Sequence, residues 1–534
     1  MPWPFQPGVT EYLIPDTLTL KPEREEGMSQ TAGAYHEKTS YNRSKMGGHF
    51  LDWQNQPETI KRYDGRETVA MPRDMPLSGE DLFSLYEGPC KTRVSNVVFD
   101  LEELSRILLL TYTLTSQSRH ANGMFYYRSA ASAGALYPTE IYVMSHGVEG
   151  LDHGIYHFSI HDHSLVRLRE GRFSGAVSRF VNDRASDGMP LAFFLTAIFA
   201  RSAWKYGNRS YRYHLLDTGH VLENLHLSLK ALGYPFENTF DFEDQRVNHL
   251  LGLDEEREVA LAVCRVRGKL DSLGAFDPLV IEDLPETVKK ASQVSPHEIE
   301  APLVPAVHNA GYDLNSVETN LNVCNHLGII SKSRIPVFSE SRPESDLPYP
   351  EAVFRRRSSR NFVAETLPIS QLYALLNVIT AANCGSMDRY LHSICTGFLT
   401  NRVGSLGDGF YLMDENKGGF GLVAPGAFTG AMSHICLDQD WMGSAALHFM
   451  FMTHMTSLEE AWGPRGYRYA MMTAGIMGER LYLAASALGL GCCGIGAFYD
   501  GEASRLLGLN ETSRVLYVIS LGILKSMRKR DALL

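Results

Sequence analysis

A long segment of this 534-residue chain occurs twice, and this duplication constrains the fold more than any other feature. The run Arg209-Ser-Tyr-Arg-Tyr213 returns as Arg465-Gly-Tyr-Arg-Tyr469, 256 positions further along, and the alignment continues without a gap to Leu253 and Leu509. Of these 45 positions 17 are identical, against roughly 3 expected from ordinary residue usage. A repeat of this length exceeds a solenoid unit, so it indicates a duplicated domain.

The first copy of the repeat predicts a long helix over residues 202–232. Its leucines, from Leu215 to Leu232, follow the spacing of one buried helical stripe, and Gly233 stands where a C-cap is expected. Short apolar runs predict strands, and the run 154–168 predicts two strands joined by a turn near His161. This order of elements predicts, in each half, an α+β fold with helices packed on an antiparallel sheet.

Composition divides the chain into four parts. Residues 1–85 are rich in Pro, Gly and charge and predict an N-terminal arm or cap. Residues 86–270 form the first copy and residues 351–534 the second. The Pro- and acid-rich residues 271–350 predict a linker that wraps around one domain and places the second beside it.

Charge and cysteine content predict the compartment and exclude some partners. The net charge of −11, with no basic stripe, argues against nucleic acid as a partner. The N-terminus has no signal-peptide pattern, and the longest apolar run, 190–200, is about half a membrane span, which fits a buried strand. Eight scattered cysteines without paired CxxC sets predict free thiols and a cytoplasmic location.

Three stretches have compositions that suit a ligand site. Arg356, Ser358 and Arg360 alternate, so an extended backbone would place them on one side as a cradle for phosphate or a flavin edge. The spacing alone favours a solvated basic turn. The small residues of 129–140 would allow a backbone to approach a flat ligand, although close packing uses the same residues. Four glycines between positions 489 and 496 suit a backbone that passes under a planar ring.

Two further groups carry side chains with acid–base or metal-binding chemistry. Lys205 and Tyr206 form an amine–phenol pair, and a cationic lysine would lower the pKa of the phenol so that Tyr206 acts as a base. The alternative is an aromatic residue beside a solvated lysine. The histidines at 157, 161 and 163 lack a matching carboxylate or cysteine, so we expect exposed strand residues and no metal. Asp217 and His220 are expected to make a buried polar contact between the copies.

Five motifs together resemble a known family. RRRSSRNF (355–362), SAGALYPTE (132–140), the run from Lys205 to Leu225, ALGLGCCGIGAFYD (487–500) and YHEKTSY (35–41) resemble the FMN-dependent nitroreductase superfamily, specifically its SagB-type thiazole/oxazole dehydrogenase branch. The resemblance covers about residues 90–270 and 350–525.

The resemblance implies an intramolecular pseudo-dimer with FMN at the interface of the two copies. One composite site is then expected to be complete, whereas the reciprocal one inherits degenerate parts, such as Ala461 and Trp462 in place of the Lys–Tyr pair. The catalytic pair is Lys205 and Tyr206. The expected cofactor-binding residues are Ser132, Ala133, Gly134 and Leu136 from the first copy, and Arg356, Ser358, Arg360, Gly489, Gly491, Cys492, Gly494, Ile495, Gly496 and Lys525 from the second.

The function implied by the resemblance is oxidation of thiazoline or oxazoline rings in a ribosomal peptide to thiazole or oxazole, with FMN reoxidised by oxygen. It further implies a peptide or small-molecule substrate and a cyclodehydratase partner. Two alternatives are an NAD(P)H-dependent nitro- or quinone reductase of the same fold, and a flavin-free scaffold subunit of a peptide-modifying complex. Both a lone pseudo-dimer and a pair of such chains are compatible with the sequence.

Overall fold

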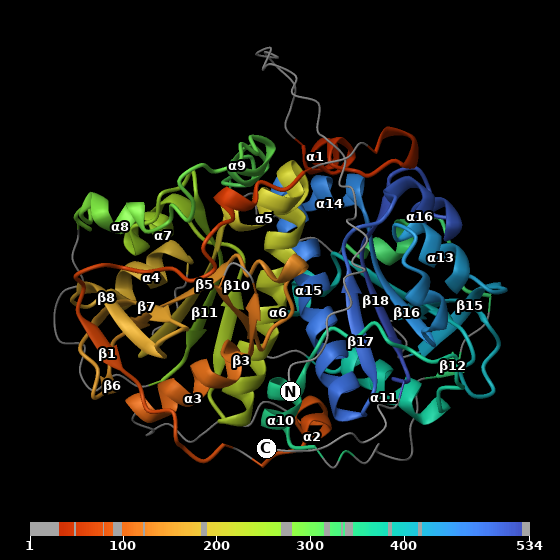
Figure 1. The fold of residues 1–534 in the computed structure, drawn as a ribbon, viewed down its shortest axis with the longest axis horizontal. Coiled ribbons are helices and arrows are strands. Elements are labelled where there is room, and N and C mark those ends of the chain that lie inside the picture. The colour runs from red at the N-terminus through yellow and green to blue at the C-terminus, as the bar shows by residue number, and fades with distance from the viewer. Residues whose placement is uncertain are drawn as a thin grey trace.

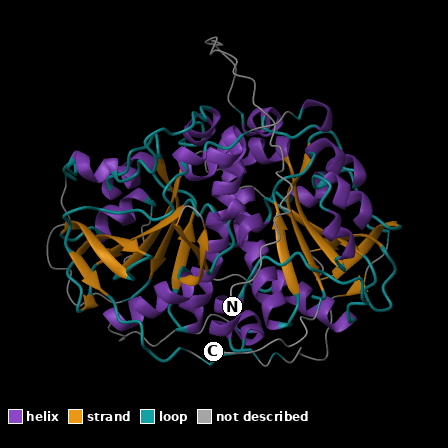
Figure 2. Cartoon of the chain, in the orientation of Figure 1, coloured by secondary structure: helices purple, strands orange, loops and turns teal. Residues whose placement is uncertain are grey.

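In the computed structural model, two antiparallel sheets flank a central layer of helices (Figure 2). The structure describes residues 31–46, 50–77, 79–88, 99–120, 123–182, 189–268, 280–313, 321–332, 335–336, 345, 347–382, 387–414 and 419–525. The first sheet has the strand order β1-β8-β7-β5-β9-β11-β10, and the second has β12-β15-β14-β13-β16-β18-β17. The same order occurs in both halves, so the structure confirms the duplicated α+β fold that the sequence predicts.

The elements of the first half run from the N-terminal arm to the end of its sheet. They are α1 (Ala32–Lys38), η1 (Arg43–Lys45), η2 (Trp53–Asn55), β1 (Thr68–Ala70), α2 (Leu82–Glu87), β2 (Phe99–Asp100), α3 (Leu101–Thr111), β3 (Leu114–His120), β4 (Gly123–Arg128), η3 (Ala133–Ala135), β5 (Thr139–Ser145), β6 (Val148–Glu149), β7 (Gly154–Ser159), β8 (Ser164–Glu170), α4 (Ser174–Phe180), β9 (Leu191–Ile198), α5 (Phe199–Tyr206), η4 (Gly207–Arg209), α6 (Ser210–Ala231), β10 (Phe236–Thr239), α7 (Asp244–Leu251) and β11 (Glu258–Val266).

The second half begins with the segment that follows β11. Its elements are α8 (Glu286–Lys290), α9 (Leu303–Asn309), η5 (Val323–His326), β12 (Ile335–Pro336), α10 (Tyr349–Arg355), α11 (Ile369–Thr380), α12 (Asp388–Leu391), β13 (Cys395–Thr400), β14 (Gly409–Asp414), β15 (Gly419–Pro425), α13 (Thr429–Ile435), η6 (Asp440–Ser444), β16 (Leu447–His454), α14 (Met455–Trp462), η7 (Gly463–Arg465), α15 (Gly466–Ala487), β17 (Gly491–Ile495), α16 (Asp500–Leu506) and β18 (Ser513–Gly522).

The two repeated helices α6 and α15 lie side by side at the centre of the molecule (Figure 1). Both are buried along almost their whole length, because each packs against its own sheet on one side and against the other helix on the other. One predicted boundary is wrong: residues 202–232 are two helices, since Gly207, with a φ of 51°, ends α5 before α6 begins. The break places Lys205 and Tyr206 at the C-terminal end of α5.

Residues 271–350 contain a counterpart of the N-terminal arm and are more than a linker. His36 of α1 contacts the Tyr467 hydroxyl at 3.0 Å, and His308 of α9 contacts the Tyr211 hydroxyl at 3.1 Å. Tyr211 and Tyr467 are equivalent positions of the repeat. Each arm helix therefore lies across the start of the opposite copy's central helix (Figure 1).

A buried ion cluster accompanies each arm helix. Asp500 pairs with Arg209 at 2.8 Å and Arg212 at 2.6 Å, across the two copies. In the pseudo-symmetric cluster, Asp244 pairs with Arg465 and Arg468. These charges are buried and mutually compensated, which joins the two halves through polar contacts as well as apolar packing.

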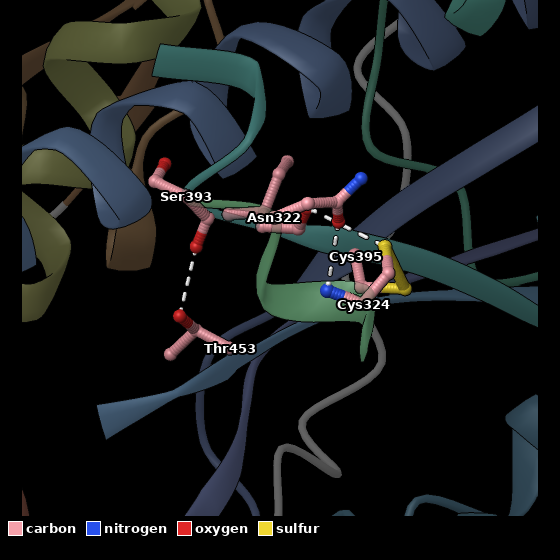
Figure 3. Close-up of a disulfide and its surroundings, with 6 residues drawn as sticks. Asn322, Cys324, Ser393, Cys395 and Thr453 are labelled. Carbon is pink, nitrogen blue, oxygen red and sulfur yellow. Dashed lines mark hydrogen bonds between the residues drawn. A yellow bond between two sulfur atoms is a disulfide. The ribbon is translucent and has the colours of Figure 1, made fainter. Parts of the chain in front are cut away.

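The structure corrects the expectation that every cysteine is a free thiol. Cys324 of η5 forms a disulfide with Cys395 of β13 (Figure 3). Nearby, Asn322 Oδ1 accepts a hydrogen bond from the Cys324 amide at 3.0 Å. The bond ties the second arm to a central strand of the second sheet. The other four described cysteines are buried and free, including the adjacent pair Cys492 and Cys493, while Cys90 and Cys384 lie outside the described residues.

The histidines of the β7–β8 hairpin are only partly as expected. His161 is partly exposed at the turn, whereas His157 and His163 are buried. His157 contacts Glu140 at 2.8 Å and His163 contacts Ser105 Oγ at 2.6 Å. Within the described ranges, no group of three or more His, Cys, Asp or Glu side chains could hold a metal ion. None of the helices in those ranges combines the length and apolarity needed to cross a membrane.

Candidate functional site

The Arg-x-Ser-x-Arg segment runs alongside β17 at the edge of the second sheet. Ser358 forms a parallel β-bridge with Cys492, and the Ser359 amide donates to the Cys492 carbonyl at 2.8 Å. The Tyr482 hydroxyl of α15 contacts Ser358 Oγ at 2.9 Å and accepts from the Gly494 amide at 2.6 Å. These bonds bring together two of the stretches that the sequence singled out.

Arg356 extends from this segment to the first copy. Its Nη2 donates to the Arg128 carbonyl at 3.1 Å, and its Nε donates to the Ser129 carbonyl. The side chain is buried, and its Nη1 has no hydrogen-bond partner among the described residues. A buried N–H group without a partner is costly, so this atom is suited to an anionic or carbonyl-bearing ligand.

The small-residue loop before β5 lies directly under the Lys–Tyr pair. Gly134 has a φ of 63°, and a β-carbon there would lie 2.8 Å from the Tyr206 hydroxyl and 3.4 Å from Cδ of Lys205. Glycine is therefore required by both conformation and space. Leu136, in the same loop, is buried. The loop and the pair, 70 residues apart in sequence, form one wall of the site.

Charge at this wall is predominantly positive. Burial, and then the charge of Arg360, lower the pKa of Lys205, so cations from both copies face each other here. Burial raises the pKa of Tyr206 well above the usual range, and Arg360 opposes this only in part. The expectation that Lys205 lowers the pKa of the phenol is therefore wrong: in the folded chain Tyr206 stays a neutral donor, and Lys205 is the group whose proton is more easily lost.

The glycine-rich run forms the edge strand β17 of the second sheet. A β-carbon on Gly494 would lie 1.9 Å from the Tyr517 hydroxyl, and one on Gly496 would lie 2.5 Å from the Tyr213 ring. The glycines are therefore required for packing against aromatic side chains of the protein itself. Ile495 faces the outer core, and Gly489 follows α15 with a φ of 68°.

The remaining predicted residue, Lys525, is exposed, and its amide donates to the Asn361 carbonyl at 2.9 Å beside Arg360. It thus lies next to the cationic segment. Sequence reasoning did not select Tyr213 and Tyr482. The Tyr213 ring packs against Gly496, and the Tyr482 hydroxyl hydrogen-bonds with Ser358 Oγ. Tyr213 could have been selected because it is one of the identical positions of the repeat.

The reciprocal interface is filled by aromatic side chains. Phe240, which is equivalent to Gly496 in the repeat, packs against Tyr390 of α12 with ring centroids 4.4 Å apart. Tyr390 also packs against Tyr469, at 4.9 Å, and Trp462 packs against Tyr469 at 5.6 Å. The Tyr390 hydroxyl accepts from the Phe240 amide at 3.1 Å. We call these four side chains the aromatic plug. Residues 91–96, which precede the first copy's α3 as the Arg356–Arg360 segment precedes α11, lie outside the described residues.

We call the interface that carries Arg356, Arg360, the Lys205–Tyr206 pair and loop 132–137 the equipped interface. The chemistry of these residues fits the phosphate and polar edge of a flavin. The interface offers the unpartnered Arg356 Nη1, a second cation in Arg360 and a third in Lys205, with backbone of the loop 132–137 and of β17 on either side. The plugged interface has alanine at the position equivalent to Lys205 and a phenylalanine at that of Gly496. The two interfaces of one pseudo-dimer thus differ in charge and in space.

The fold and this interface define a flavin-type oxidoreductase class, and the family is shown by direct comparison. A family model described as the nitroreductase family matches residues 96–269 and 413–523, more than half of the chain. The chain therefore belongs to the nitroreductase family. A solved structure from Anabaena variabilis, described as a nitroreductase, is similar over 93% of this chain and 100% of its own, with a TM-score of 0.74 and 27% identity.

Two curated relatives resemble parts of the chain. A protein of Methanocaldococcus jannaschii described as a nitroreductase is 29% identical over 156 residues, which is 29% of this chain and 75% of that protein. The trifolitoxin-processing protein TfxB of Rhizobium leguminosarum is 30% identical over 164 residues, which is 29% of this chain and 44% of that protein. These similarities agree with the family recognised from the sequence motifs.

Proposed function

We propose that this protein is an FMN-dependent dehydrogenase that oxidises thiazoline or oxazoline rings in a ribosomal peptide to thiazole or oxazole. The observation that carries the proposal is the asymmetry between its two interfaces. In the part of the chain that the structure describes, one interface alone has the Lys205–Tyr206 pair, the glycine loop beneath it and the Arg356–Arg360 segment opposite. The similarity to a trifolitoxin-processing protein supports a peptide substrate.

The residues that would hold FMN come from both copies. Arg356, Ser358 and Arg360 would bind its phosphate and polar edge, and backbone of 132–136 and 489–496 would flank its ring. Lys525, next to this segment, would add charge. When bound, FMN supplies the hydride acceptor. One FMN per chain is expected because the aromatic plug fills the reciprocal interface.

The Lys205–Tyr206 pair would handle the proton. Aromatisation removes a proton from the ring carbon next to the carbonyl and a hydride from the adjacent ring carbon. The lowered pKa of Lys205 makes its ammonium group easier to deprotonate, and the amine that results can accept that proton. The raised pKa of Tyr206 keeps its O–H as a hydrogen-bond donor that orients the substrate carbonyl. Both side chains are partly buried, which limits the access of water to the transfer.

The two electrons taken from the ring would then reduce oxygen, the oxidant of the cycle, to hydrogen peroxide. The azoline itself must be made by cyclodehydration of a Cys, Ser or Thr side chain onto the backbone, so association with a cyclodehydratase is part of the proposal. A cytoplasmic location is compatible with it, because ribosomal peptides are modified where they are made.

The test mixes the purified protein anaerobically with an azoline-containing peptide or with NADH, and follows flavin absorbance and peptide mass. The proposal predicts bleaching by the peptide, with loss of two hydrogens per ring, and recovery of absorbance on admitting oxygen. Lys205→Ala is expected to slow bleaching about 100-fold, whereas Trp462→Phe in the plug leaves it unchanged. Rapid bleaching by NADH alone would favour a nitro- or quinone reductase instead. Absence of flavin would favour a scaffold.

A further inference from the structure

Asp217 of α6 carries a buried carboxylate that faces the inner side of loop 132–137. Ser132 Oγ donates to its Oδ2 at 2.6 Å, and the Ala133 amide donates to its Oδ1 at 3.1 Å. Both of these hydrogen-bond donors are neutral, and Asp217 is 4% exposed. Burial raises the pKa of this carboxyl to about 7, and the hydrogen bond from Ser132 opposes the shift. The contact is within the first copy, so the expected contact between copies is made by His220 alone, which bonds Glu479 at 2.5 Å.

The loop that Asp217 holds has an unfavourable backbone. Gly134, Ala135 and Tyr137 have φ values of 63°, 54° and 49°. Two of the three are not glycine, and each left-handed residue with a side chain costs roughly 1–2 kcal/mol. The Tyr137 amide donates to Ser132 Oγ at 2.8 Å, and that hydroxyl in turn donates to Asp217. A single carboxylate therefore fixes both ends of the strained turn.

The strained turn lies against the Lys205–Tyr206 pair. Gly134 is in contact range of the Tyr206 hydroxyl and the Lys205 stem, as its hypothetical β-carbon shows. A shift of the turn by one ångström would open or close this contact. The position of the proton-handling pair relative to any ligand between loop and β17 is thus coupled to the bonds that Asp217 accepts.

At the equivalent described positions, the second copy has neither the carboxylate of Asp217 nor the left-handed turn that it holds. The residue equivalent to Asp217 is Thr473, whose buried Oγ1 has no hydrogen-bond partner among the described residues. The segment before β13 is the short helix α12, with Tyr390 in the aromatic plug. Within the described ranges, the carboxylate and the left-handed turn before β5 thus occur together beside the equipped interface and not at the reciprocal one.

We infer that Asp217 is a positioning residue that holds loop 132–137 against the Lys205–Tyr206 pair and so sets the geometry of the ligand site. The role in catalysis rests on the proposed function; the hold on the loop does not. The titratable groups that face Asp217 are Tyr206 of α5 and Tyr517 of β18, both neutral phenols whose pKa values it helps to raise, and His220 on its own helix is occupied by Glu479.

The neutral surroundings of the Asp217 carboxyl predict that the opening of loop 132–137 depends on pH. An open loop hydrates the carboxyl and returns its pKa to the ordinary range, so ionisation favours opening. Protection of the loop amides is expected to fall as pH rises from about 4 to about 7, by up to tenfold per pH unit, and then to level off. A neutral side chain of the same shape, as in Asp217→Asn, removes this dependence.

The experiment measures hydrogen exchange of residues 129–138 by mass spectrometry at several pH values, corrected for intrinsic rates, in the full chain. Asp217→Ala is expected to accelerate exchange about tenfold, and Ser132→Ala to do so in part. Asp217→Asn is expected to give a flat pH profile. Thr473→Val, the matched change in the second copy, is expected to leave loop exchange unaltered.

A parallel arm measures the FMN dissociation constant of the same variants. We expect it to rise about tenfold in Asp217→Ala and to stay unchanged in Thr473→Val. Loop exchange that is unaltered in Asp217→Ala, or a pH profile that persists in Asp217→Asn, would overturn the inference. If no variant, wild type included, binds FMN, the proposed function fails, but the exchange data still decide the role of Asp217.

Discussion

Gly219 of α6 and Gly475 of α15 face each other where the two central helices cross. A β-carbon on Gly219 would lie 2.3 Å from the Met472 carbonyl oxygen, and one on Gly475 would lie 2.3 Å from the Leu216 carbonyl oxygen. The two residues are equivalent positions of the repeat, so the pseudo-two-fold axis of the molecule passes close to this contact. The approach of the copies, and hence the composite site between them, depends on it.

Gly219→Ala and Gly475→Ala are each expected to destabilise the chain by about 3 kcal/mol, because main chain on both sides prevents the added methyl from being accommodated. Denaturant unfolding followed by circular dichroism measures the change. The control is Gly430→Ala in α13, where nothing lies within 4 Å of the added atom; it should stabilise by about 0.5–1 kcal/mol. Equal effects at all three positions would contradict the close crossing.

The arm histidines predict acid sensitivity. Burial, and then Arg212, lower the pKa of His36 to about 3, so the folded chain keeps it neutral while the unfolded chain protonates it near pH 6.5. Stability should therefore fall as pH drops from about 6.5 toward 3, by ~1.4 kcal/mol per pH unit for this residue. His36→Gln should flatten the fall, whereas His297→Gln at an exposed site should not. A slope unchanged in His36→Gln would count against a buried neutral imidazole.

The disulfide predicts sensitivity to reductant. Cys324 and Cys395 are 71 residues apart, and closing a loop of that size stabilises a fold by about 2–4 kcal/mol. Dithiothreitol should lower the melting temperature of the wild type but have no further effect on Cys324→Ser, which should already melt lower. Cys436→Ala removes a buried free thiol and should retain the response to reductant. A wild type that does not respond to reductant would show that the bond is not formed in solution.

The Lys205–Tyr206 pair predicts a pH profile for azoline oxidation. The rate should rise with pH as the Lys205 ammonium loses its proton, and level off below the ordinary range of lysine because burial and Arg360 lower its pKa. Lys205→Arg keeps the charge but cannot lose the proton, so it should be at least about 100-fold slower. Tyr206→Phe should be slower while retaining the rise. A profile unchanged in Lys205→Arg would assign the base elsewhere.

Much of this could be predicted from the sequence, because the repeat keeps its apolar spacing and its identical positions. The strands and the central helices follow from this spacing, and the contact of Arg356 with the Arg128 and Ser129 carbonyls of the first copy is compatible with the interface that the family resemblance implies. The second arm, which contains α9, could not be predicted. Its main similarity to the first arm helix α1 is one histidine, His308 in α9 and His36 in α1. A single polar residue in a short helix gives no periodic signal.

Other features depend on contacts that no local pattern encodes. The pKa of Tyr206 follows from its burial, which outweighs the neighbouring lysine on which the sequence argument relied. The aromatic plug requires Tyr390 of α12 to meet Phe240 of the other copy. The role of the β17 glycines follows from Tyr213 and Tyr517, which are distant in sequence. Each of these depends on tertiary packing.

The central claim is that one of the two interfaces binds FMN and the other is filled. The most direct measurement is the ratio of FMN to chain in the purified, undenatured protein after saturation with FMN, by absorbance and total protein. The account predicts about one FMN per chain, retained in Tyr390→Phe and lost in Gly496→Phe, which places the bulk of Phe240 at the equipped interface. Two FMN per chain with similar affinity, or one FMN retained in Gly496→Phe, would contradict it.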